Sequence, residues 1–320
     1  MSVFVTRRIP QVGLDRLREH GIEFEIGQPD DERPLARSSL LAGVRRHEVL
    51  LSLLTERIDR EVLAANPRLR GVSNMAVGVD NIDLVAAREL GIPVGNTPDV
   101  LTSATADLTW ALLLAAARRV VEAHAFMVAG RYDLWGPELL CGVDVGPGVT
   151  GRRKTLGIVG FGRIGAAVAQ RARGFEMEVL ASGTEASRAR IDAAPDVEAC
   201  RFEDLLERSD FVSVHVPLTE ATRHMFGADA FRRMKRQAVF VNTSRGPVVD
   251  EAALATALTG GEIAAAGLDV YEHEPRMVPE LRDLTNVVCL PHIGSATVDT
   301  RDRMATMAAD NAVRFLTSAE

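Results

Sequence analysis

The segment Thr155–Gly165, with the sequence TLGIVGFGRIG, constrains the fold more than any other part of the chain. An apolar run of strand length, Leu156–Val159, leads to Gly160, Gly162 and Gly165, and alanine-rich, helix-forming residues follow. This is the G-x-G-x-x-G pattern between a strand and a helix, which is the context that the motif requires. The first glycine permits a tight turn, the second lets the backbone approach a pyrophosphate, and the third lets helix and strand pack closely. The segment therefore predicts a dinucleotide site at a helix N-terminus.

Strand-like apolar runs alternate with helical patterns on both sides of the glycine motif. This alternation predicts an α/β protein, because a parallel connection between strands needs a helical crossover that covers the sheet. At 320 residues the chain exceeds one typical domain, so we expect two domains, each a doubly wound parallel sheet. The expected strands are Val3–Thr6, Phe24–Ile26, Val49–Leu54, Leu69–Met75, Ile92–Val94, Leu156–Val159, Glu178–Ala181, Phe211–Val216, Ala238–Asn242, Ala265–Val270 and Val287–Leu290.

Three segments depart from this alternation. Residues 28–39 are polar and contain proline, so we expect a loop there. Residues 107–130 are apolar around most of a helical circumference, which predicts one long helix buried between domains or subunits. Residues 131–153 contain Trp135, two prolines and five glycines, and they are too long for a plain connector. We expect this last segment to be an arm or a binding loop.

The charge and the cysteine content exclude several classes of protein. A net charge of −7 gives no basic surface for nucleic acid, so we predict no nucleic-acid partner. The cysteines Cys141, Cys200 and Cys289 are scattered without C-x-x-C spacing, which argues against a disulfide framework and a zinc site. We therefore predict no metal and a reducing, cytoplasmic location. The N-terminus lacks the apolar region of a signal peptide, and no run of about 18 apolar residues follows, so we expect no membrane segment.

Three further stretches place reactive side chains just after apolar strands, where ligands bind in open α/β sheets. Arg245 lies in NTSRGPVVD, Glu274 in GLDVYEHEP and His292 in LPHIGSAT. The arginine can grip a carboxylate with two donors and polarise an adjacent keto oxygen. The histidine can give a proton to the alkoxide that forms as hydride arrives, and the glutamate can stabilise the imidazolium. Together the three residues indicate the reduction of a carbonyl group by hydride.

Other residues compete for these roles. Glu272 lies two positions from Glu274, and spacing alone does not separate the two. His273 is a weaker rival for the acid–base role. His215 ends a strand before Pro217, where it either lines the cofactor site or simply closes the strand. A single arginine or glutamate is more often a solvated surface residue, so the case depends on the three residues coming together.

Six motifs carry a family resemblance over nearly the whole chain: VGVDNIDLVAARELGIPVGNTPDVLT, TLGIVGFGRIG, FVSVHVPLTEATRHMF, VNTSRGPVVDEAAL, AAAGLDVYEHEP and PHIGSAT. With these motifs the sequence resembles the D-2-hydroxyacid dehydrogenases, and NTPDVLT favours the branch of glyoxylate and hydroxypyruvate reductases. The resemblance implies a flavodoxin-like substrate-binding domain formed by residues 1–99 and 291–320. It also implies a Rossmann cofactor domain of residues 100–290, with an interdomain cleft.

The resemblance assigns roles to single residues. The family's catalytic arginine, glutamate and histidine fall on Arg245, Glu274 and His292, which favours Glu274 over Glu272. Besides Arg245 and His292, its contacts to the substrate fall on Val77, Gly78, Leu101 and Ser295. Its cofactor-lining positions fall on Thr105, Gly160, Gly162, Arg163, Ile164, Gly165, Ser182, Gly183, Val216, Pro217, Thr222, Thr243, Ser244, Asp269 and Gly294.

The cofactor preference depends on the end of the strand that follows the glycine motif. NAD-preferring members have an acidic residue there for the ribose hydroxyls, and this chain has Gly183. NADP-preferring members often have arginine at the next position, which here is Thr184. The remaining candidates for a phosphate partner are Ser182, Ser187, Arg188 and Arg190. We expect NADP, with NAD as the alternative because Glu185 is available for the acidic role.

The resemblance also implies an activity. It is the NAD(P)H-dependent reduction of small 2-keto acids, glyoxylate or hydroxypyruvate, to 2-hydroxy acids, with His292 as general acid. It implies a homodimer in which residues 118–153 form a dimerisation arm. Two alternatives remain open: a dehydrogenase for a larger acid such as 2-ketogluconate, and a dinucleotide-sensing binding protein like the family's transcriptional corepressors.

Overall fold

The computed structural model describes residues 1–29 and 34–318, and the chain divides into two compact units. Unit 1 comprises residues 1–101 and 295–320, and unit 2 comprises residues 102–294. Residues 291–294, which we expected in the substrate-binding part, belong to unit 2. They are held there because the Asp269 carboxylate accepts hydrogen bonds from the N–H groups of Ile293 and Gly294, each at 2.7 Å.

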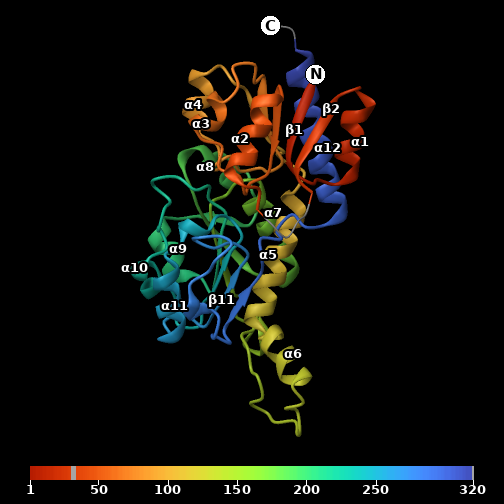
Figure 1. The fold of residues 1–320 in the computed structure, drawn as a ribbon. Helices are drawn as coiled ribbons and strands as arrows, with labels where there is room; N and C mark the ends of the chain where they lie inside the picture. Colours follow the sequence, from red (N-terminus) through yellow and green to blue (C-terminus); the bar gives the residue numbers. More distant parts are fainter. Residues whose placement is uncertain (30–33, 319–320) are drawn as a thin grey trace. The chain divides into compact units, whose positions relative to one another are not determined.

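Unit 1 is built on a five-stranded parallel sheet, of which Figure 1 labels β1 and β2. The strand order is β2–β1–β3–β4–β5. The order reverses at β1 and β3, which is the flavodoxin-like form of a doubly wound sheet. The strands are β1 (Ser2–Arg7), β2 (Glu23–Gln28), β3 (Val49–Ser52), β4 (Gly71–Asn74) and β5 (Val94–Gly95). The helices are α1 (Gln11–Glu19), α2 (Arg37–Arg46), α3 (Arg60–Ala64), α4 (Leu84–Glu89) and α12 (Val298–Thr317).

Helices cover both faces of this sheet. Along β1, Val3 and Val5 join the core formed with α1 and α12, whereas Phe4 joins the core formed with α2 and α3. The alternation arises because successive side chains of a strand point to opposite faces. Helix α12 comes from the far end of the sequence and packs against α1, β3 and β4 (Figure 1). It therefore completes the first of these two cores.

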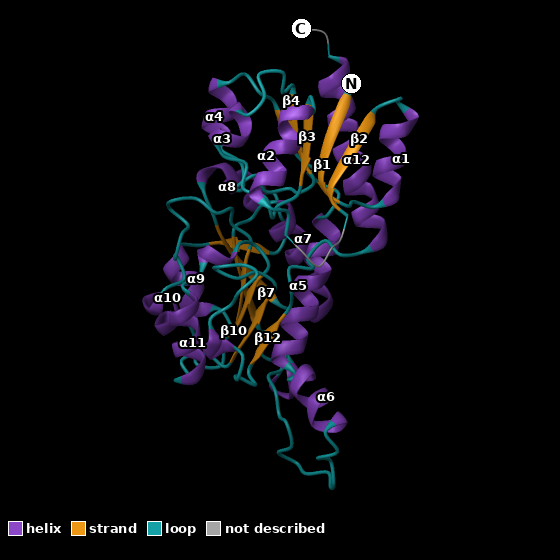
Figure 2. Ribbon diagram, viewed as in Figure 1, coloured by secondary structure: helices purple, strands orange, loops and turns teal. Residues whose placement is uncertain are grey.

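Unit 2 contains a seven-stranded parallel sheet, of which Figure 2 labels β7, β10 and β12. The strand order is β12–β11–β10–β9–β6–β7–β8. The order reverses between β6 and β9, as in Rossmann sheets, so the prediction of two doubly wound parallel sheets is confirmed. The strands are β6 (Thr155–Val159), β7 (Glu178–Ser182), β8 (Val197–Ala199), β9 (Phe211–Val214), β10 (Val239–Asn242), β11 (Ala265–Leu268) and β12 (Val287–Cys289). The helices are α5 (Thr102–Ala117), α6 (Val120–Val128), α7 (Arg163–Ala172), α8 (Glu185–Asp192), α9 (Phe202–Arg208), α10 (Ala228–Arg233) and α11 (Glu251–Thr259).

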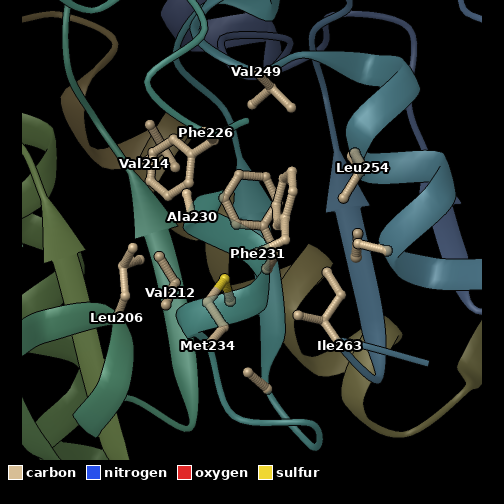
Figure 3. Packing of buried hydrophobic residues seen from close by; sticks show 14 of the residues in the cluster. Leu206, Val212, Val214, Phe226, Ala230, Phe231, Met234, Val249, Leu254 and Ile263 are labelled. Carbon is tan, nitrogen blue, oxygen red and sulfur yellow. The ribbon is translucent and has the colours of Figure 1, made fainter. Parts of the chain in front are cut away.

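Two apolar cores lie on opposite faces of the seven-stranded sheet. On one face, α5 and α7 contribute side chains such as Leu112 and Val168. On the other face, α9, α10 and α11 enclose a cluster that includes Phe240 together with Phe226 and Phe231, which are labelled in Figure 3. The rings of Phe231 and Phe240 meet edge to face with their centroids 5.5 Å apart. Both faces are therefore covered, and open α/β sheets of this kind bind ligands at the carboxyl ends of their strands.

The structure corrects three expectations about single elements. The long helix expected over residues 107–130 is two helices, because Arg119 has a φ of +53° between α5 and α6. The loop expected over residues 28–39 is shorter, because α2 begins at Arg37; residues 30–33 of that segment lie outside the described residues. Strand β8 is not predicted by the sequence, because three residues are too few to show a periodic pattern.

Helix α6 and the segment after it leave apolar side chains uncovered. The helix has no buried residue, and the side chains of Val128, Leu134 and Trp135 are 73%, 84% and 70% exposed. In Figure 2, α6 and this segment extend away from the seven-stranded sheet. The C-terminal half of the expected buried helix is therefore exposed in the single chain. Among the described residues, no helix is both long enough and apolar enough to cross a membrane.

Candidate active site

The glycine motif joins β6 to α7, whose first residues are Arg163 and Ile164. Gly160 has a φ of +95°, a backbone conformation that L side chains rarely adopt. A Cβ atom on Gly165 would lie 2.3 Å from the carbonyl oxygen of Gly160, so the close packing of helix on strand requires glycine there. A Cβ atom on Gly162, in contrast, would meet nothing within 4 Å. The backbone at Gly162 is thus open to a ligand at the start of α7, which fits a pyrophosphate.

Two alanine variants separate the structural and the binding roles of these glycines. We expect Gly162→Ala to keep wild-type stability but to bind NADPH and NADH more weakly, because the methyl group meets only the space left for the pyrophosphate. We expect Gly165→Ala to lower the free energy of unfolding by about 1–3 kcal/mol, because its methyl group collides with backbone. Thermal denaturation and fluorescence titration with NADPH measure the two effects. Unchanged coenzyme affinity in Gly162→Ala would contradict a dinucleotide site at this motif.

The end of β7 carries no acidic side chain for ribose hydroxyls. The strand ends at Ser182, and Gly183 follows it. A Cβ atom on Gly183 would lie 2.3 Å from the Oγ atom of Ser187, which itself donates to the carbonyl oxygen of Thr184 at 2.7 Å. Any larger residue at 183 would therefore have to displace the Ser187 side chain.

The two arginines of α8 differ in their surroundings. The Arg188 guanidinium pairs with Asp192 at 2.8 Å on an exposed part of the helix. The Nη1 atom of Arg190 donates to the carbonyl oxygen of Phe161 at 3.1 Å. Phe161 lies inside the glycine motif, so Arg190 places a positive charge beside this motif. Glu185 lies exposed in the first turn of α8.

Arg245, Glu274 and His292 follow three adjacent strands. They come after β10, β11 and β12, which are neighbours in the parallel sheet, so all three lie at its carboxyl edge. The Nδ1 atom of His292 is 2.9 Å from the Oε2 atom of Glu274, and the two side chains remain 28% and 30% exposed. Among the described residues, the Nε2 atom of His292 has no hydrogen-bond partner. This nitrogen is therefore the one available to exchange a proton with a ligand.

The Glu274 carboxylate is oriented from two sides. Its Oε1 atom accepts a hydrogen bond from the Tyr271 N–H at 3.0 Å, while Oε2 faces His292. Burial raises the pKa of Glu274, but the His292 hydrogen bond, the Tyr271 N–H and the charge of Arg245 outweigh this effect, so the pKa lies below its usual value. The carboxylate is therefore ionised at neutral pH and stabilises a positive charge on the His292 ring.

The loop that carries Arg245 is held by Asn242, the last residue of β10. The Nδ2 atom of Asn242 donates to the Arg245 carbonyl oxygen at 3.0 Å. Its Oδ1 atom accepts from the Ser244 N–H at 3.0 Å and from the Ser244 hydroxyl at 2.8 Å. The sequence prediction omits Asn242. The signal that could have found it is a polar residue at the end of a buried strand, directly before a reactive loop.

Three predicted cofactor residues lie close together, and one of them, Asp269, carries a buried carboxylate. Asp269 is 1% exposed, and its two oxygen atoms accept the N–H groups of Ile293 and Gly294. Burial raises the pKa of Asp269, against the opposing effects of these N–H groups and of His292. A Cβ atom on Gly294 would lie 3.5 Å from the Oγ1 atom of Thr105. Thr105, Asp269 and Gly294 are therefore brought together although they come from distant parts of the sequence.

Other predicted cofactor residues also follow strand ends in unit 2. Val216 and Pro217 come after β9, and a Cβ atom on Gly160 would lie 2.8 Å from the Cγ1 atom of Val216. The β9 loop therefore contacts the glycine motif. The hydroxyl of Thr222 donates to the Pro217 carbonyl oxygen at 2.6 Å and so closes this loop. Thr243 follows β10 directly.

The competing residues have other partners. The Oε1 atom of Glu272 is 2.7 Å from the Nε2 atom of His224. The His273 side chain is 73% exposed, and its Nε2 atom is 4.0 Å from Glu272. Burial lowers the pKa of His215 to about 3, and its Nε2 atom lies 2.8 Å from the Ser213 hydroxyl. His215 is therefore neutral at physiological pH, and its partner is Ser213, two residues earlier in the chain.

The four remaining predicted substrate-binding residues, Val77, Gly78, Leu101 and Ser295, belong to unit 1. Val77 and Gly78 lie in the turn that follows β4, and both are partly exposed. Leu101 packs against the core formed with α1 and α12. Ser295 begins the second segment of unit 1 and precedes α12.

Comparison with known proteins identifies relatives over nearly the full length. Residues 110–294 match the family described as D-isomer specific 2-hydroxyacid dehydrogenase, NAD binding domain. The glyoxylate reductase of Korarchaeum cryptofilum is 51% identical over 316 residues, which cover 98% of this chain and 92% of that protein. The structure is similar to that of the TT0316 protein of Thermus thermophilus, with a TM-score of 0.89, 44% identity and coverage of 99% and 97%. It is also similar to an NADPH-dependent glyoxylate/hydroxypyruvate reductase of Sinorhizobium meliloti in complex with NADP and malonate, with a TM-score of 0.83, 32% identity and coverage of 100% and 94%.

Proposed function

Because this chain belongs to the D-isomer specific 2-hydroxyacid dehydrogenase family, we propose that it reduces glyoxylate, and as a second substrate hydroxypyruvate, to the 2-hydroxy acid. The observation that carries the proposal is the pairing of His292 Nδ1 with Glu274 Oε2 at 2.9 Å. This pair lies at the carboxyl edge of the same sheet as the glycine motif. The identity of 51% to a glyoxylate reductase supports the choice of glyoxylate over a larger acid such as 2-ketogluconate.

The residues of the site have complementary chemical roles in this proposal. A nicotinamide dinucleotide, when bound, supplies the hydride that is added to the carbonyl carbon. His292 gives the proton from Nε2 to the carbonyl oxygen, and Glu274 stabilises the ring in its protonated form. Arg245 donates hydrogen bonds that stabilise the negative charge developing on that oxygen. The N–H groups of Val77 and Gly78 hold the substrate carboxylate.

A steady-state assay of the purified chain tests the activity. Glyoxylate, hydroxypyruvate, pyruvate and 2-ketogluconate are compared at saturating NADPH and at saturating NADH. We expect kcat/KM to be highest for glyoxylate and hydroxypyruvate. Binding of NADPH without turnover of any of these acids would favour the corepressor-like alternative, in which the dinucleotide is only sensed.

For the cofactor, we propose a preference for NADP. Gly183 offers no carboxylate to repel a 2′-phosphate, and Arg190 lies against the glycine motif through Phe161. We expect Arg190→Ala to lower kcat/KM for NADPH about ten-fold, because a hydrogen-bonded cation for the 2′-phosphate is lost, and to change that for NADH little. Arg173→Ala, which alters an arginine paired with Asp196, is the matched control. Equal losses for NADPH and NADH in Arg190→Ala would contradict this preference.

We also propose that the chain forms a homodimer through residues 118–153. The support is the run of uncovered apolar side chains on α6 and after it, among them Val128, Leu134 and Trp135. Burial of such a patch against a second copy removes apolar surface from water. Sedimentation of the purified chain distinguishes a dimer from the monomer of 34.6 kDa. The cytoplasm remains the predicted compartment, since Cys141, Cys200 and Cys289 are free thiols.

A further inference from the structure

In the turn after β4, the carbonyl oxygens and the N–H groups differ in whether they have hydrogen-bond partners. The carbonyl oxygens of Ala76, Val77 and Gly78 all accept hydrogen bonds from within unit 1. Among the described residues, in contrast, the N–H groups of Val77, Gly78 and Val79 donate to no atom of the chain. All three of these residues are partly exposed. The carbonyl groups of the turn are therefore held by the protein, whereas its N–H groups are available to a ligand.

Each carbonyl oxygen of the turn has its own donor. The Thr97 N–H donates to Ala76 at 2.9 Å, and the Asn96 side-chain amide donates to Val77 at 2.8 Å. The Nδ2 atom of Asn74 donates to the Gly78 carbonyl oxygen at 3.0 Å. Because a carbonyl oxygen only accepts, the atom that faces it from each asparagine is the NH₂ group.

The two asparagines are themselves held in place. Asn74 ends β4 and is fully buried, and its Oδ1 atom accepts from the Ser52 hydroxyl at 3.0 Å. Its Nδ2 atom also donates to Asn81 at 3.1 Å. The Asn96 backbone carbonyl accepts from the Asn311 side chain of α12 at 3.0 Å. The donors to the turn are therefore preorganised rather than free to rotate.

Because the peptide unit is planar, fixing a carbonyl group of the turn also fixes the next N–H group. The C=O of one residue and the N–H of the next lie in one plane and point in opposite directions. Holding the Val77 carbonyl oxygen therefore sets the direction of the Gly78 N–H, and holding the Gly78 carbonyl oxygen sets that of Val79. Successive N–H groups directed to one side form a concave site that suits an anion such as a carboxylate.

We propose that Asn96, supported by Asn74, is a positioning residue that aims the backbone N–H groups of this turn at the substrate carboxylate. The inference rests on the proposed function, in which Val77 and Gly78 hold that carboxylate. Because the carboxylate carries the same charge before and after hydride addition, this interaction is uniform between ground state and transition state. Its loss raises KM and leaves kcat nearly unchanged.

The test compares Asn96→Ala and the milder Asn96→Ser with the wild type. We expect both variants to raise KM for glyoxylate and the inhibition constant of oxalate, about ten-fold for Asn96→Ala, with kcat within about three-fold and NADPH affinity unchanged. Asn66→Ala is the matched control, because Asn66 is a buried amide of unit 1 that holds the carbonyl oxygens of Val44 and His47. It lowers Tm without moving KM or the oxalate constant.

The outcomes separate the two levels of the proposal. If the wild type reduces glyoxylate and the Asn96 variants keep its KM and its oxalate constant, the positioning role is wrong and the proposed function stands. A fall in kcat at unchanged KM would overturn the positioning role as well. If the wild type reduces no 2-keto acid, the proposed function fails and this inference fails with it. Should Asn96→Ala not fold, Asn96→Ser gives the decision, since a half-buried serine disturbs the packing less.

Discussion

We expect His292→Ala to lower kcat for glyoxylate reduction by about 10²- to 10⁴-fold, the range for losing a positioned proton donor. The reason is the geometry at the carboxyl edge of unit 2. The Oε2 atom of Glu274 lies 2.9 Å from Nδ1 of the ring. The Nε2 atom is therefore directed away from the carboxylate and is able to protonate the substrate oxygen. Single-turnover rates with saturating coenzyme measure the change without interference from product release.

The neighbouring histidine gives the control for this variant. His273→Ala removes a ring that is 73% exposed and 4.0 Å from Glu272, and we expect its kcat to match the wild type. A near-normal kcat in His292→Ala combined with a large loss in His273→Ala would reassign the proton donor to His273. Coenzyme titration of both variants shows whether either change acts through NADPH binding instead.

The second large effect is expected at Arg245. We expect Arg245→Lys to lower kcat/KM for glyoxylate by about 10- to 100-fold, because a single ammonium group cannot reproduce the planar pair of donors. Both kcat and KM should change, since the guanidinium contacts the substrate and also stabilises charge that develops during the reaction. Steady-state kinetics over a range of glyoxylate concentrations separates the two constants.

An exposed arginine on the loop of Glu274 serves as the comparison. Arg276→Lys keeps the charge of that loop, and we expect it to leave both constants unchanged. If Arg245→Lys behaved in the same way, the substrate would be held by backbone N–H groups without help from the guanidinium. The Asn242 contacts that hold the Arg245 backbone involve main-chain atoms, so the lysine variant retains them.

The sequence predicts the sheets and the reactive edge because both depend on local patterns. Most buried strands are short apolar runs, and the reactive residues lie in the loops that follow such runs, as Arg245 lies three residues after the end of β10. In a parallel sheet the carboxyl ends of neighbouring strands share one edge, so residues distant in sequence are brought together by topology. The pairing of His292 with Glu274 is therefore a consequence of strand order, because β11 and β12 are neighbours in the sheet.

Features that depend on tertiary contacts are not accessible in this way. The break at Arg119 has neither glycine nor proline to signal it, and the Arg119 side chain donates to the distant carbonyl oxygen of Cys141 at 3.5 Å. Asn96 and Asn242 are similar cases, because an asparagine near a strand end is common and its target is known only from the fold. The pattern of the polar segment before α2 likewise hides the start of a helix at Arg37.

The origin of α12 in the last part of the sequence has a consequence for biogenesis. Its buried residues Met304, Ala305 and Ala308 complete the core that also contains Val3 and Val5 of β1. During translation, residues 1–101 leave the ribosome with this apolar face uncovered. It stays uncovered until α12 is made, because residues 102–294 are translated first. Unit 2 can therefore fold before unit 1 is complete, and a nascent chain that stops before residue 298 leaves the apolar face that α12 covers exposed to water.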